Sequence, residues 1–278
     1  MEFDLTKCNK ILDEFEILVN EGKCNDYEGP LKIGVDLGTA NIVLAAVDMN
    51  NNPVAGVTCR SSLVKDGIVV DYIGAIKVVK ELKIKLEKIV NTELTTAATA
   101  IPPGILGGNI KVISNVVSGA GFYVNNVIDE PTAAATVIQC TDGAVVDVGG
   151  GTTGVSILKD GEVIFTGDEP TGGTHMTLTL AGYYGMTIED GEEYKLDKAN
   201  EDDVFHIVEP VVEKMAAIIK NYVKDYDVNN IYVVGGACCF EKFQTVFEQY
   251  IGIKTVKPSV PLLVTPLGIA MNSKIDCY

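Results

Sequence analysis

Positive charge is scarce in this chain. Its 278 residues include 22 lysines and arginines against 38 aspartates and glutamates, which gives a formal net charge of −16. A surface of that sign repels the phosphates of nucleic acids and offers no basic anchor to anionic lipids. We therefore expect neither a nucleic acid nor a membrane among the partners.

Long apolar runs and cysteine motifs are missing as well. No stretch approaches the ~20 apolar residues that a membrane helix needs, and Glu2 and Asp4 stand where a secretory signal carries positive charge. The seven cysteines are odd in number and include no CxxC pair, which argues against a disulfide framework and a structural zinc site. These features predict a cytoplasmic protein.

The chain contains an internal repeat of two similar segments, called the echo below. One segment, from Ile33, reads IGVDLGTANIVLAAVDMNNNPVAGV, and another, from Ala144, reads AVVDVGGGTTGVSILKDGEVIFTG. Each gives an apolar strand with an aspartate, a Gly/Thr turn and two further strands. Asp36 and Asp147 hold the same place in the two copies. A repeat of this size predicts a duplicated α/β domain.

Helical patterns follow each copy. We expect them at 78–90, 110–120, 175–184, 204–223 and 240–250, with a further strand at 231–234. Strands that alternate with helices predict α/β layers with mixed sheets.

The first 29 residues are predicted to form a separate element. Apolar residues from Cys8 to Val19 recur at helical spacing, Gly22 ends the pattern, and a linker follows. The amphipathic helix either packs on its own protein or offers its apolar face to a partner.

The glycine turn at 149–154, GGGTTG, formally matches the dinucleotide-binding pattern GxGxxG. That motif requires a helix after the turn. Here 155–158 leads instead to Asp160-Gly161 and a second apolar run, which is typical of a hairpin. No GxxxxGK[ST] loop occurs either, so neither a dinucleotide fold nor a Walker loop is expected.

A different phosphate site is compatible with these turns. Hairpin turns rich in glycine and threonine can present several backbone N–H groups to anionic oxygens. Asp36 and Asp147 beside them would repel a bare phosphate but suit a magnesium ion and its waters. Two such turns facing one another would grip the phosphates of a nucleotide from both sides.

Three more segments fit the same cleft. Glu130 precedes an alanine-rich helix at 132–139, where its carboxylate could orient a water or simply favour the helix start. VVGGA at 233–237 ends a strand in glycines that permit close approach by a flat ring. PLGIA at 266–270 begins a small-residue helix that could cross the alanine-rich one.

In order and spacing these motifs resemble the actin-like ATPase superfamily of actin, sugar kinases, DnaK-type heat-shock chaperones, MreB and FtsA. DLGTAN (36–41) and DVGGGTT (147–153) look like its two phosphate motifs, and DEPTAAA (129–135) and PLGIA look like its connecting helices. In its compact length the chain most resembles the EutJ family of ethanolamine utilisation. That family is chaperone-like and encoded with bacterial microcompartments.

The resemblance implies ATP and Mg2+ as ligands, with Asp36 and Asp147 organising the metal mainly through water. It implies catalytic roles for Glu130 and Asp147 in orienting the attacking water. The implied phosphate contacts are Gly38, Thr39, Ala40, Asn41, Gly149, Gly150, Gly151, Thr152 and Thr153. The implied adenosine contacts are Glu192, Lys195, Gly235, Gly236 and Ala237.

The resemblance also predicts an architecture. It is a duplicated, ribonuclease H-like core with mixed sheets and two domains flanking a nucleotide cleft. The outer subdomains are expected to be reduced, because the segments 54–70 and 195–204 are short. We expect an N-terminal helix and linker at 1–29, domain I at 30–137 plus 266–278, and domain II at 138–265. Gly154 departs from the chaperones, which place an acidic residue there.

The function that we expect is a slow Mg-ATP switch. Its expected partners are microcompartment shell components or ethanolamine-utilisation enzymes, so we expect the cytoplasmic protein to associate with the microcompartment. Two alternatives stay open. The chain could be a nucleotide-independent scaffold with a decayed cleft, or a small-molecule kinase on the same core.

Overall fold

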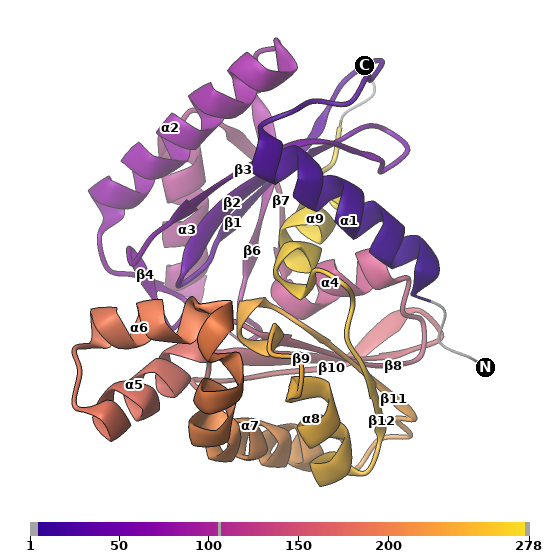
Figure 1. Ribbon diagram of the computed structural model, residues 1–278. Coiled ribbons are helices and arrows are strands. Elements are labelled where there is room, and N and C mark those ends of the chain that lie inside the picture. The colour runs from indigo at the N-terminus through magenta and orange to yellow at the C-terminus, as the bar shows by residue number, and fades with distance from the viewer. Residues whose placement is uncertain (1–4, 105–106, 276–278) are drawn as a thin grey trace.

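Two mixed sheets of identical topology carry the fold of this computed structural model, which describes residues 5–104 and 107–275. Their strand orders are β3-β2-β1-β6-β7 and β10-β9-β8-β11-β12. In each sheet three strands form an antiparallel meander, a fourth strand pairs in parallel with the first of them, and a fifth pairs in parallel with the fourth. Figure 1 shows the first sheet above the second. The predicted duplicated α/β core with mixed sheets is confirmed.

The aspartates of the echo occupy equivalent places in space. The first sheet comprises β1 (Lys32–Leu37), β2 (Asn41–Val47), β3 (Pro53–Arg60), β6 (Thr96–Ile101) and β7 (Tyr123–Asp129). The second comprises β8 (Gly143–Val148), β9 (Thr153–Lys159), β10 (Glu162–Glu169), β11 (Asn230–Val234) and β12 (Lys254–Val256). Asp36 and Asp147 are each the last residue but one of a central strand.

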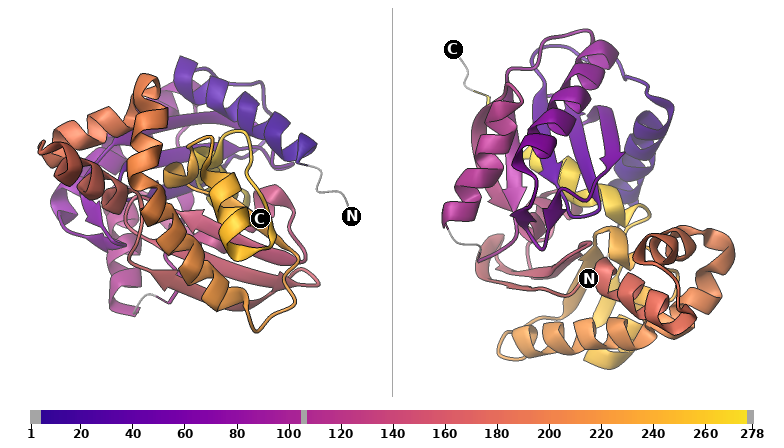
Figure 2. Two further views of the ribbon diagram at one scale, coloured as in Figure 1. Left: turned by 60° about the horizontal axis from the view of Figure 1, so that its bottom comes forward. Right: turned by 90° about the vertical axis from the view of Figure 1, so that its left-hand side faces the viewer.

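Helices cover the outer faces of the sheets. The first sheet carries α2 (Tyr72–Val90) and α3 (Gly107–Gly119), and the second carries α7 (Glu201–Val223) and α8 (Phe243–Ile251). The two lobes separate clearly in the right-hand view of Figure 2. At one side of the lower lobe lie α5 (Gly173–Tyr184) and α6 (Ile188–Leu196).

Several boundaries differ from the sequence predictions. Helix α2 begins at Tyr72 rather than 78, because the Asp71 carboxylate caps it by accepting a hydrogen bond of 2.9 Å from the Gly74 N–H. Helix α8 begins at Phe243 rather than 240, since a 3-10 turn, η2 (Gly236–Cys238), comes first. Helix α6 and the small hairpin of β4 (Val64–Lys65) and β5 (Ile68–Val69) were not predicted from the sequence.

The two predicted connecting helices cross between the sheets, as expected. They are α4 (Glu130–Ile138), capped by Asp129, and α9 (Val264–Met271). A Cβ placed on Gly268 would lie 2.0 Å from the carbonyl oxygen of Ala133, so only glycine permits this crossing. Every residue of α9 is buried. The pair therefore joins the two halves of the molecule, the first built on the β1 sheet and the second on the β8 sheet, at one tightly packed point (Figure 1).

The N-terminal helix packs on its own protein. In α1 (Thr6–Glu21), Leu12 and Phe15 are fully buried, and the Phe15 ring lies against Gly56 of β3. The Ser259 hydroxyl also donates to Asp13 at 2.6 Å, which ties the helix to the second half. The hypothesis that this apolar face is offered to a partner is thus wrong for this structure. Gly22 ends the helix, as predicted, and its backbone lies in the left-handed region (φ 62°).

The domain boundaries given above stay a prediction, and their residues 1–4, 105–106 and 276–278 lie outside the described part. No helix within the described part is both long and apolar enough to cross a bilayer.

Candidate functional site

A cavity of about 910 Å³ lies between the two halves and is lined by both copies of the echo. The strands, turns and α6 bring most of the predicted site residues to its wall. Those residues are Asp36, Gly38, Thr39, Ala40, Asn41, Glu130, Asp147, Gly149, Gly150, Gly151, Thr152, Glu192, Lys195, Gly235, Gly236 and Ala237. Thr153 is the exception: it is fully buried in β9 and its hydroxyl donates to the Thr171 carbonyl at 2.5 Å.

The two glycine turns face each other directly. A Cβ placed on Gly150 would lie 3.2 Å from the Thr39 Cβ and 3.3 Å from the Ala40 nitrogen. Within the first turn, a Cβ on Gly38 would approach the Asn41 carbonyl oxygen to 2.8 Å. Side chains larger than hydrogen would therefore separate the turns or distort the first of them. The glycines keep two backbone loops from different halves in contact at one end of each meander.

The start of α5 holds the second turn in place. The Gly173 N–H donates to the Gly149 carbonyl at 2.9 Å, and the Thr174 N–H donates to the Gly150 carbonyl at 2.7 Å. Both carbonyls of the turn are thereby directed at the helix start, and the turn is anchored to α5.

Carboxyl groups from four different strands or helix ends share this region. Burial and the nearby Asp147 charge raise the pKa of Asp36 to about 7, and burial raises the pKa of Asp147 to about 6. The pKa of Glu130 is raised well above its usual range by burial and by Asp147 and Asp36. Burial, together with repulsion among the carboxylates, therefore disfavours the ionised forms of these groups.

Asp168 is the fourth carboxyl group, and it was not predicted from the sequence. It pairs with Gly154 across the β9–β10 register, and its Oδ1 is a buried oxygen without a hydrogen-bond partner. Burial raises its pKa to about 7, opposed by a hydrogen bond from Thr152. A Cβ on Gly154 would lie only 3.4 Å from that oxygen. An acidic side chain from β10 thus reaches the space beside Gly154.

Asp147 is fixed by contacts from both sides. The Thr265 hydroxyl, at the start of α9, donates to Asp147 Oδ2 at 2.5 Å. A Cβ on Gly235, whose φ is +92°, would lie 2.4 Å from Asp147 Oδ1. The glycine after β11 is therefore required by the aspartate. Thr265 directly precedes the PLGIA motif, which is the sequence signal that could have identified it.

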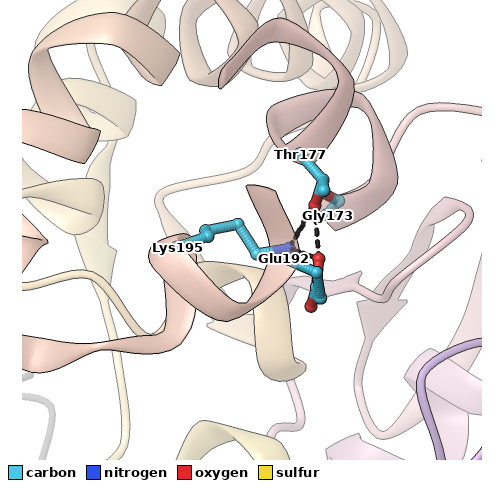
Figure 3. A network of polar contacts seen from close by, with 4 residues as sticks. All are labelled: Gly173, Thr177, Glu192 and Lys195. Carbon is cyan, nitrogen blue, oxygen red and sulfur yellow. Dashed lines mark hydrogen bonds and ion pairs between the residues drawn. The ribbon is translucent and has the colours of Figure 1, made fainter. Parts of the chain in front are cut away.

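A buried lysine organises the α5–α6 side of the cavity (Figure 3). Lys195 Nζ donates to Glu192 Oε2 at 2.6 Å, to Thr177 Oγ1 at 2.7 Å and to the Gly173 carbonyl at 3.1 Å. Burial lowers the lysine pKa, and the Glu192 charge opposes that change. Glu192 and Lys195 of the GEEYK segment at 191–195 therefore form an ion pair with each other, and the lysine also supports the start of α5.

The chemistry of the carboxyl cluster fits a divalent cation. Buried carboxyl groups that raise one another's pKa values are stabilised by a nearby cation, and one oxygen of Asp168 in this cluster has no hydrogen-bond partner. In residues 5–104 and 107–275, no three acidic, cysteine or histidine side chains converge enough to hold an ion directly. Magnesium commonly keeps several waters and binds through phosphates, which suits this wider arrangement.

Comparison with known proteins identifies the family. The chain is 38% identical to the ethanolamine utilization protein EutJ of Salmonella typhimurium over 246 residues, covering 88% of this chain and 86% of that protein. The chain belongs to the EutJ family. The crystal structure of EutJ from Carboxydothermus hydrogenoformans superposes with a TM-score of 0.90 at 46% identity, covering 95% of this chain and 97% of the other.

The EutJ family shares its fold with other actin-like proteins. The family model for MreB/Mbl protein matches residues 57–188, and that for Type IV pilus assembly protein PilM matches 124–263. MreB5 of Spiroplasma citri, crystallised with AMPPNP, superposes with a TM-score of 0.69 at 16% identity, covering 87% of this chain and 95% of that one. At that identity the likeness shows the fold alone. The expected actin-like fold is confirmed.

Proposed function

We propose that this EutJ-family chain binds Mg-ATP in the cavity between its sheets and hydrolyses it slowly, as a nucleotide switch in ethanolamine utilisation. One observation carries the proposal: two echoed glycine turns face each other across one cavity, each beside the carboxylate of a central strand. The nucleotide-bound crystal structure of an MreB with the same fold supports it.

The phosphates would lie along the turns at 38–41 and 149–152, where glycines leave backbone N–H groups open to close approach. Asp36 and Asp147 would hold the waters of the magnesium ion. The ion would neutralise charge on the phosphate oxygens. Thr265 would keep the Asp147 carboxylate in place, because its hydroxyl already donates to one of the two oxygens.

Glu130 would orient the attacking water and accept its proton. Burial and the neighbouring carboxylates raise the pKa of Glu130, and a protonated carboxyl group cannot act as a base. A cation among the four carboxyl groups would lower that pKa, since opposite charge favours the ionised form. Glu130 would therefore act as a base more readily in the loaded site than in the empty one.

The nucleoside would lie toward the second half of the chain. Glu192 and Lys195 on α6 and the backbone of Gly235, Gly236 and Ala237 line that part of the cavity. The Lys195–Glu192 pair presents one half-exposed carboxylate, to which ribose hydroxyls can donate.

Nucleotide would act as a switch by binding the closed cleft better than the open one. The halves meet at the α4–α9 crossing, which is the natural pivot for such closure. We propose that the closed form is the one recognised by a shell component or enzyme of the ethanolamine-utilisation microcompartment.

Isothermal titration of the full chain with Mg-ATP tests the proposal. We expect saturable heat for one site per chain and slow release of phosphate with no added acceptor. Phosphate transfer only when an acceptor is added would instead identify a kinase. The absence of binding heat, together with a protease digestion pattern that nucleotide leaves unchanged, would identify a scaffold and refute the proposal.

A further inference from the structure

Few cationic side chains line the cavity, and two of them already form ion pairs. Four cationic side chains line it, those of Arg60, Lys65, Lys195 and Lys198. Lys195 is paired with Glu192 at 2.6 Å, and Lys198 with Glu201 at 2.9 Å. Both of these pairs lie on the side of the second half. The first half therefore supplies the cations that remain, Arg60 and Lys65, and it supplies them from the short segment between β3 and β5.

Arg60 stands out within that segment. It is the only arginine in the sequence. The ion pairs found within the described residues do not include it, although it is exposed at a cavity lined by many acidic side chains. A single arginine kept at an acidic cavity, without a carboxylate partner, is placed to meet an anion that enters from solution.

The backbone fixes Arg60 beside the first glycine turn. It is the last residue of β3, and in the β2–β3 register it lies opposite Asn41, which closes that turn. The next residue is also tied to the turn, because the Ser61 N–H donates to the Ala40 carbonyl at 3.0 Å. The arginine side chain therefore begins one strand away from the backbone that would hold the phosphates.

We propose that the Arg60 guanidinium binds the outermost phosphate of the nucleotide. Its planar fork donates two parallel hydrogen bonds to phosphate oxygens, a geometry that a lysine ammonium does not match. Arg60 belongs to the first half, whereas the residues proposed for the nucleoside belong to the second. The contact therefore favours a triphosphate over a nucleoside. This inference rests on the proposed function and names a residue that determines its specificity.

The small hairpin beside Arg60 explains how the contact stays close to both turns. A Cβ placed on Gly151 of the second turn would lie 2.8 Å from the Asp66 nitrogen at the tip of the β4–β5 hairpin. The segment from Arg60 to Gly67 thus runs from the first turn to the second. An anion held by both turns would lie beneath this segment, with Arg60 at its first end.

Titration calorimetry of the full chain tests the inference with three variants. Arg60→Gln removes the charge, Arg60→Lys keeps it without the fork, and Lys80→Gln removes an equal charge from the exposed face of α2, outside the cavity. Each variant is titrated with Mg-ATP and, separately, with adenosine. Arg60 is exposed, so melting temperatures should agree with that of the wild type.

We expect Arg60→Gln to weaken Mg-ATP binding about tenfold or more, since a hydrogen bond to a charged group contributes ~1.5–3 kcal/mol. Arg60→Lys should recover part of the loss. Adenosine affinity should change less than twofold, and Lys80→Gln should change neither affinity. An Mg-ATP affinity of Arg60→Gln within twofold of wild type, or an equal loss for adenosine, would overturn the inference and leave the proposed function intact. A wild type that gives no heat with Mg-ATP would refute both.

Discussion

Asp147→Asn should make the nucleotide-free protein more stable at pH 8 and, at the same time, weaken Mg-ATP binding by about 10- to 100-fold. Asp147 is only 7% exposed and its pKa is raised from 3.8 to about 6 by burial. Asparagine keeps the shape of the side chain, and its carbonyl can still accept the Thr265 hydroxyl. The variant therefore loses the charge that the metal needs without losing the packing.

The stability gain should depend on pH in a defined direction. Between about pH 4 and pH 6 the folded protein keeps a proton on Asp147 that the unfolded chain releases, so the stability of the wild type falls as the pH rises through this window. Above about pH 6 the full cost of the buried Asp147 charge is present, and Asp147→Asn should raise the free energy of unfolding by about 1–3 kcal/mol. Near pH 4 the difference should vanish.

Urea denaturation at pH 8 and near pH 4, with calorimetry at pH 8, measures both effects. Asp225→Asn, an exposed aspartate just after α7, is the matched control and should change neither stability nor binding. A variant that is less stable than wild type at pH 8 would contradict the electrostatic account of the cluster. Unchanged Mg-ATP affinity would contradict the role of Asp147 in the site.

Glu130→Gln should separate binding from hydrolysis. The amide has the volume of the carboxyl group and can hold a water, but it cannot accept a proton. We therefore expect phosphate release to slow by about 10²–10³-fold, in the range typical of a lost general base. Mg-ATP affinity should stay within about threefold, because the proposed phosphate contacts come from the glycine turns rather than from this side chain.

Single-turnover phosphate release and calorimetry on the same preparation check this prediction. Glu213→Gln, on the exposed face of α7, serves as the control for removal of one carboxylate. Hydrolysis at the wild-type rate in Glu130→Gln would remove Glu130 from the chemistry. A parallel loss of affinity would show that the side chain binds nucleotide rather than positions water.

The sequence pattern was sufficient for the duplicated core because the echo is local. Asp36 and Asp147 each lie near the end of an apolar strand before a glycine turn, so their equivalence is visible along the chain. The topology then brings the turns together. The small residues Ala133 and Gly268 also predicted the crossing of α4 and α9, since a close helix crossing needs small residues on both sides.

Other features depend on contacts that no local pattern encodes. Asp168 reaches the cluster only because β10 pairs with β9 opposite Gly154, and its own neighbours give no motif. Arg60 acquires its position from the register of β3 against Asn41. The N-terminal helix has an amphipathic pattern that fits either its own protein or a partner, and tertiary contacts such as that of Phe15 with Gly56 decide between them.

A crystal structure of the full chain saturated with Mg2+ and a non-hydrolysable ATP analogue examines the paired turns themselves. The account predicts triphosphate density between 38–41 and 149–152, a hydrated metal within reach of Asp36 and Asp147, and the base toward α6. Crystals in which nucleotide occupies another surface, or in which the space beside the turns holds only solvent at saturating ligand, would contradict it.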